Sequence, residues 1–132
     1  MAVPQRWRMQ GHASDGYSGA QARSLLIRRL DWASQETWFE DGRGRLLSVV
    51  TNGERAMVAL TDGAGGPGEH LVDPRGEGVS GGYLRSSGQI DTYSDRETVP
   101  FPVACRAVEH FFEHGTWPHD VLVEMTRPWN PR

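Results

Sequence analysis

Lysine is missing from the chain and cysteine is almost missing: all fourteen basic residues are arginine, and Cys105 is the single thiol. One cysteine excludes an internal disulfide and any zinc site built from several thiolates. No stretch approaches the ~20 apolar residues that a membrane helix needs, and residues 1–9 lack the apolar centre of a signal peptide. The sequence therefore predicts a soluble, cytoplasmic protein with no membrane association.

Positive charge is also in short supply. The 132 residues, enough for one compact domain, carry a net charge of −3. Residues 1–35 hold five arginines against two acids, a balance of +3, whereas residues 36–132 hold nine arginines against fifteen acids, a balance of −6. A nucleic-acid binder normally presents a basic surface, so direct binding of nucleic acid is not expected. An acidic body suits a basic partner.

Two segments have helical periodicity. Apolar residues recur at helical spacing between residues 19 and 32, and Ser18 is placed to cap that helix. A second helix is predicted over residues 102–114, because Pro102 stands in its first turn and Gly115 occupies the position of a C-terminal cap.

Turn residues separate several short apolar runs. Asn52-Gly53 between two such runs is the strongest hairpin signal, because a tight two-residue turn needs residues that tolerate positive φ. Strands are predicted over residues 37–40, 45–51, 54–61, 82–85, 89–93 and 121–125, with a further short strand at 70–72 inside a glycine-rich loop over 63–82. This order predicts an α+β fold: a mostly antiparallel sheet of five to six strands with two helices packed on one face.

The predicted domain organisation is simple. Residues 1–17 read as a flexible arm that Trp7 anchors, residues 18–126 as a single α+β domain, and residues 127–132 as a proline-rich tail.

The most specific chemical motif is His110-x-x-Glu113-His114, which is the inverted zinc-peptidase pattern on a predicted helix. Such enzymes take another carboxylate ligand from a distant segment, and here only Asp120 and Glu124 follow. Gly115 also ends the helix at once. The motif is therefore interpreted as a solvated helix end whose histidines complement the helix dipole, and a small zinc-dependent hydrolase stays as an alternative. We predict no catalytic residue, cofactor or metal ion.

Cys105 is interpreted as a buried side chain. It lies five residues before His110, about 140° away around a helix, so the two cannot act as nucleophile and base. We expect Phe111 and Phe112 to divide between core and rim, with Phe112 and Val108 packing Cys105 against the sheet.

The C-terminal half carries a family resemblance. Thr-Val-Pro at residues 98–100, Ala-Val-Glu-His-Phe-Phe at 107–112, Gly-Thr-Trp-Pro at 115–118 and Val-Leu-Val-Glu at 121–124 resemble the ending of immunity protein family one from bacterial polymorphic toxin systems. In that family a Val-Pro segment leads into a helix, a glycine exit and a last strand. Residues 44–49, 54–56 and 82–84 fit the family's sheet, so the resemblance spans residues 20–126.

The resemblance implies a function. Members of this family are cytoplasmic antidotes without catalytic activity, and each binds and blocks one toxin domain, often a nucleic-acid deaminase or nuclease. Such a toxin must hold its substrate in a basic groove, which an acidic inhibitor can occupy. A deaminase is the first expectation for the partner, and a generic interaction domain with a non-toxin partner is the alternative.

The toxin-binding surface is predicted on the acidic, glycine-rich loop and its flanking strands, because long loops inside compact domains are commonly functional. The face bearing Trp38, or the tail with Trp129, is the alternative surface. The candidate contact residues are Asp62, Glu69, Asp73, Glu77, Tyr83 and Trp38.

Overall fold

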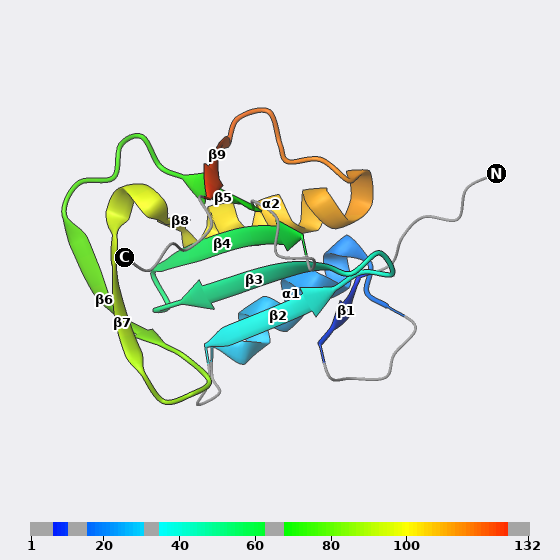
Figure 1. Cartoon of the computed structure of the whole chain (residues 1–132), viewed down its shortest axis with the longest axis horizontal. Coiled ribbons are helices and arrows are strands. Elements are labelled where there is room, and N and C mark those ends of the chain that lie inside the picture. Colours follow the sequence, from blue (N-terminus) through cyan, green and yellow to red (C-terminus); the bar gives the residue numbers. More distant parts are fainter. Residues whose placement is uncertain (1–6, 11–15, 31–34, 63–67, 127–132) are drawn as a thin grey trace.

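The computed structural model describes residues 7–10, 16–30, 35–62 and 68–126. It confirms the α+β class: a mostly antiparallel sheet has two helices on one of its faces (Figure 1). The elements are β1 (Arg8–Met9), α1 (Gly19–Arg29), β2 (Glu36–Glu40), β3 (Arg45–Thr51), β4 (Arg55–Asp62), β5 (Gly68–Val72), β6 (Val79–Leu84), β7 (Ile90–Ser94), the short 3₁₀ helix η1 (Asp95–Glu97), β8 (Val99–Pro100), α2 (Phe101–His114) and β9 (Leu122–Thr126).

The main sheet has seven strands in the order β1-β2-β3-β4-β5-β9, and β8 pairs with β4 beside this path. Strands β3 and β4 form the predicted hairpin around Asn52 and Gly53, whose φ is 96°. The Asn52 side chain accepts hydrogen bonds from the backbone N–H groups of Glu54 and Arg55, at 3.0 and 2.8 Å. This turn fixes the register of the sheet's centre.

Both helices begin or end as their sequences predict. Ser18 and Gln21 form a reciprocal capping box at the start of α1, and Gly115 ends α2 in the left-handed conformation with φ 76°. The two helices touch at Gly19, where a side chain would meet the carbonyl oxygen of Glu109 at 2.4 Å. Only glycine allows this approach.

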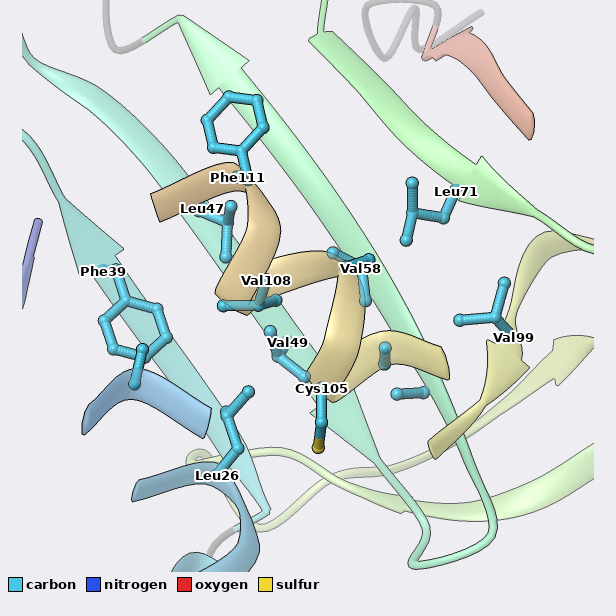
Figure 2. Packing of buried hydrophobic residues seen from close by; sticks show 14 of the residues in the cluster. Leu26, Phe39, Leu47, Val49, Val58, Leu71, Val99, Cys105, Val108 and Phe111 are labelled. Carbon is cyan, nitrogen blue, oxygen red and sulfur yellow. The ribbon is translucent and has the colours of Figure 1, made fainter. Parts of the chain in front are cut away.

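The core lies between the helices and the sheet (Figure 2). Val108 and Cys105 of α2 are buried there, as predicted. The predicted division of the two phenylalanines between core and rim is confirmed, but the core role of Phe112 is wrong, since Phe111 is 3% exposed while Phe112 is only partly buried. Phe112 instead stacks on Trp7, with ring centroids 5.5 Å apart, because one step along a helix turns a side chain by about 100°.

The interpretation of residues 1–17 as a flexible arm is wrong for their described part. Trp7 is 3% exposed within the core, and Arg8 and Met9 pair with β2. Trp7 therefore anchors this part as predicted, and Trp7, Arg8 and Met9 belong to the domain. The predicted tail over residues 127–132 and Trp129 lie outside the described residues.

Strands β6 and β7 form a separate two-stranded sheet, which lies at one end of the main sheet (Figure 1). The loop predicted over residues 63–82 therefore contains β5 and the first four residues of β6, and its residues 63–67 lie outside the described part. In the part of the chain that the structure describes, no helix combines the length and apolarity needed to cross a membrane.

Candidate functional site

The six candidate contact residues do not form one surface. Asp62 and Glu69 line one hollow at the end of β4 and β5. Asp73 and Tyr83 both lie near Arg55 of β4, Asp73 just after β5 and Tyr83 in β6. Glu77 is exposed just before β6, and Trp38 lies on β2.

The hollow beside Asp62 and Glu69 has a volume of about 430 Å³ and a mixed charge, since Arg43 and Arg45 also line it. The Glu69 carboxylate accepts a hydrogen bond of 2.9 Å from the indole N–H of Trp117. Glu69 thus tethers the segment after α2 to the sheet as well as lining the hollow. Opposite charges in the same wall make this hollow a weak candidate for a purely basic partner.

Asp73 has a structural partner. Its carboxylate accepts a hydrogen bond of 2.8 Å from Nη2 of Arg55, and this bond, with the nearby charge of Arg75, holds the pKa of Asp73 below its usual value although burial opposes the shift. The same guanidinium donates to the Thr98 hydroxyl at 2.8 Å and to the Asp95 carbonyl at 2.9 Å. Asp73 therefore joins β5 to η1 and β4.

Tyr83 is not available to a partner, which corrects its assignment as a surface anchor. It is 0% exposed and packs edge-on against Tyr93, with ring centroids 4.7 Å apart. Burial raises the pKa of the Tyr83 phenol. The side chain points between the hairpin and the main sheet because the hairpin folds back over the end of β3 and β4, a tertiary contact that glycine-rich local sequence does not reveal.

Glu77 is exposed, and the backbone on either side of it is held firmly. The N–H of Asp95 donates to the Gly78 carbonyl at 3.0 Å, and Gly76 lies so close to Asp95 that a side chain there would meet its carbonyl oxygen at 2.4 Å. The backbone that carries Glu77 is therefore held in place on both sides of the residue.

Trp38 is half-buried on β2, opposite Ser48 of β3. Phe39, its neighbour, faces the helices and is 0% exposed, so Trp38 lies on the sheet face away from them. Because β1 pairs with Phe39 and Glu40, this end of β2 is not a free edge of the sheet.

A buried carboxylate that sequence reasoning missed fastens the hairpin. Glu36 is 6% exposed, accepts hydrogen bonds from the side chains of Arg85 and Ser86, and also accepts one of 3.1 Å from the Ser86 backbone. Burial alone would raise the pKa of Glu36, but these hydrogen bonds outweigh it and lower the pKa. The partners are 49 and 50 residues away in sequence, so no local pattern announces them.

Arg85 also holds the hairpin together. Its Nη1 donates to the Asp91 carboxylate at 3.0 Å and to the Tyr93 hydroxyl at 3.2 Å. The inner face of the hairpin thus forms a polar cluster with Glu36, and the outer face of the hairpin is exposed to solvent.

The residues of the zinc-like motif are engaged in helix contacts. Glu113 accepts a hydrogen bond of 2.8 Å from the Gly19 backbone at the start of α1, and Nδ1 of His110 lies 2.7 Å from the Thr116 carbonyl oxygen. The His110 and His114 rings are 4.5 Å apart. Among the residues that the structure describes, no group of three or more potential ligands could hold a metal ion.

Cys105 is 2% exposed, and burial raises the pKa of its thiol to about 11. The thiol is therefore protonated at neutral pH, in keeping with the prediction of a packing role.

Comparison of the chain with protein-family models, with curated proteins and with solved structures finds no match.

Proposed function

We propose that this chain is an immunity protein that acts in the bacterial cytoplasm. It binds one cognate toxin domain, a nucleic-acid deaminase or else a nuclease, and blocks it by occupying the basic groove that holds the toxin's substrate. The observation that carries the proposal is the arrangement around Val99–Pro100: this segment pairs with Arg55 and Ala56 of β4 and passes directly into α2, which ends at Gly115 before β9 returns to the sheet. The segments that carry the family resemblance are thus contiguous parts of one core.

Charge supports this mode of inhibition. The chain has a net charge of −3, and Glu54 and Glu77 are exposed on the surface. A protein that acts on DNA or RNA needs a cationic groove, so an acidic inhibitor is attracted to it and associates faster at low ionic strength.

The test is co-expression with the product of the adjacent upstream gene. We expect that product to arrest growth alone, this chain to restore growth, and the two to co-purify as a complex. Copurification without growth arrest or rescue would favour the alternative of a generic interaction domain. Failure of both binding and rescue would overturn the proposal.

The remaining alternative, a small zinc-dependent hydrolase, has its own test in the variant His110→Ala/His114→Ala. Both side chains lie in the last turns of α2, so we expect growth rescue to be retained. The free energy of unfolding should change by within ~0.5 kcal/mol for the exposed His114 and by more for His110, which is partly buried and contacts the Thr116 carbonyl oxygen. Metal analysis of the purified protein accompanies this test. Stoichiometric zinc, or loss of rescue in a folded variant, would contradict the prediction.

A further inference from the structure

The β6–β7 hairpin has one face fastened to the domain and one face free. On the inner face Arg85 binds Glu36, the Ser80 hydroxyl donates to the Asp95 carboxylate at 2.5 Å, and the Asn52 side-chain amide donates to the Gly81 carbonyl at 3.0 Å. These contacts hold the hairpin at several points, so it behaves as a rigid platform whose shape is set before any partner arrives.

The outer face carries exposed apolar side chains. Side chains alternate along a strand, and Asp91 and Tyr93 both point inward to Arg85, so Ile90 and Thr92 point outward. Val79 is 70% exposed and Ile90 is 67% exposed. Burying such side chains is favourable in a complex, whereas in the free protein they remain in contact with water.

In the middle of the outer face β6 contributes glycine, opposite the outward-pointing Thr92 of β7. Gly81 and Gly82 lie between the two apolar ends, at a register shift in the pairing of β6 with β7. Glycine in a strand permits the close approach of another backbone. The outer face therefore has little side-chain volume along the middle of β6 and an exposed apolar side chain toward each end.

One exposed carboxylate lies next to the hairpin in the chain, and another lies in the β3–β4 turn that contacts the hairpin. Glu77 is exposed two residues before Val79, and Glu54 is exposed next to the Asn52 turn, which contacts the hairpin at Gly81. The closest arginine to Glu77 in the sequence is the exposed Arg75, whose backbone N–H donates to the Asp73 carboxylate at 3.0 Å.

The other exposed apolar residues have arginine side chains close by. Ile27, 49% exposed, is followed on α1 by Arg28 and Arg29, and Met125 lines the hollow that contains Arg43 and Arg45. A basic partner is repelled there.

Leu122, 53% exposed, lies near Asp120 and Glu124, but these carboxylates form ion pairs with Arg106 and Arg96. The hairpin presents two strongly exposed apolar side chains on one face, and Glu77 is exposed just before β6.

We propose that the outer face of the β6–β7 hairpin, with Val79 and Ile90 as apolar contacts and Glu54 and Glu77 on its margin, docks onto the basic groove of the toxin domain. The inference rests on the proposed function and assigns its contact surface. Charge complementarity is the argument for this occupant, since the hairpin margin is acidic and the groove of a nucleic-acid enzyme is basic.

The test measures binding rates between this chain and the catalytic domain of the adjacent upstream gene product, with its active site inactivated for safe expression. The variant Val79→Ser/Ile90→Ser removes the apolar contacts. We expect its complex to dissociate faster and its Kd to rise about 30-fold or more, because central apolar contacts dominate interface energetics. The melting temperature is expected to stay unchanged, because both side chains are exposed.

The matched control is Ile27→Ser/Leu122→Ser, which removes two apolar side chains of 49% and 53% exposure outside the hairpin. Its Kd should equal that of the wild type. Wild-type binding with equal Kd values for hairpin and control variants would overturn the docking surface and leave the proposed function standing. Absence of wild-type binding would overturn both.

A second variant tests the charge. Glu54→Gln/Glu77→Gln should slow association several-fold at low salt and little at high salt, because screening already removes the attraction there. The control Glu40→Gln/Asp120→Asn removes the same charge away from the hairpin and should slow association less. Equal slowing by both pairs would show that the acidic margin of the hairpin does not guide docking.

Discussion

Arg55 joins four segments of the chain through one guanidinium group. Its side chain contacts the turn at Asp73, the η1 helix at Asp95, and the residue before β8, Thr98, all within 3.0 Å of a donor nitrogen. Since the side chain is only 19% exposed, water does not readily replace these bonds. Loss of the donor leaves several acceptors unpaired in a part-buried place.

We predict that Arg55→Met lowers the free energy of unfolding by about 2–4 kcal/mol. The control is Arg106→Met, which breaks the exposed pair with Asp120 and should cost less than about 1 kcal/mol. Urea unfolding of both variants measures the difference. Equal costs would mean that the buried network adds nothing beyond an ordinary surface ion pair.

The two phenylalanines of α2 give a second prediction at this scale. Phe111 is 3% exposed, so Phe111→Ala should cost about 3–5 kcal/mol. Phe112 is partly buried, and Phe112→Ala should cost about 1–3 kcal/mol through its lost contacts with Trp7 and Phe39. Thermal and denaturant unfolding compare the pair, and the reverse order would contradict the observed helix face.

At the scale of the element, the β6–β7 hairpin depends on side chains for its attachment. It belongs to a separate two-stranded sheet, and Glu36 of β2 binds both Arg85 and Ser86 near its turn. A hydrogen bond to a charged group contributes more than one between neutral groups. The charge of Glu36 thus controls how tightly the hairpin is held.

We predict that Glu36→Gln lowers stability at pH 7 by about 1–3 kcal/mol. The pKa of Glu36 is lower in the folded chain than its ordinary value of 4.5, so the contribution of the carboxylate is fully present above 4.5 and is lost as the pH falls through the folded pKa. The gap between wild type and variant should therefore close in acid.

The control is Glu40→Gln on the same strand, where the carboxylate forms an exposed pair with Arg8. It should change stability little at any pH. Unfolding measured across pH 2–8 distinguishes the two, and a pH-independent gap for Glu36→Gln would contradict the argument.

Elements defined by local chemistry were predictable from the sequence, and elements defined by distant partners were not. Ser18, Gly115 and Asn52-Gly53 act within a few residues, and the structure confirms each of them. The strands β1 and β8 have two residues each, too few for a periodic pattern. Burial of Tyr83 depends on how the hairpin folds over residues that lie more than 25 positions away.

The candidate site was less predictable than the fold. Acidic residues in a glycine-rich segment suggest exposure, yet the Asp73 carboxylate binds Arg55 and the Glu69 carboxylate binds Trp117. Composition gives the charge of a segment, but only tertiary contacts decide which carboxylates remain open to a partner.

At the scale of the whole molecule, the first described residues complete the core. Trp7 packs against Phe111 and Phe112 of α2, with ring centroids 6.0 and 5.5 Å away, and the Arg45 guanidinium lies 5.3 Å from its ring. One side chain therefore joins the start of the chain to the second helix and the central sheet. The domain should unfold as a single cooperative unit.

We predict that Trp7→Ala costs about 3–5 kcal/mol and lowers the melting temperature of the whole domain in one transition. Trp38→Ala, which removes a half-buried tryptophan from the other sheet face, is the control and should cost less. Calorimetry measures both. A separate early transition in wild type, removed by Trp7→Ala, would show that the N-terminal segment unfolds independently.

The two edges of the main sheet, β1 and β9, come from opposite ends of the described chain. On the ribosome β1 emerges first, so its partner β2 can be covered at once, whereas β5 waits for β9. Val72 ends β5 and Leu122 begins β9, a separation of 50 residues. At translation rates of ~5–20 residues per second, each nascent chain leaves an open strand edge for roughly 3–10 seconds, during which neighbouring chains on the same messenger can pair with it.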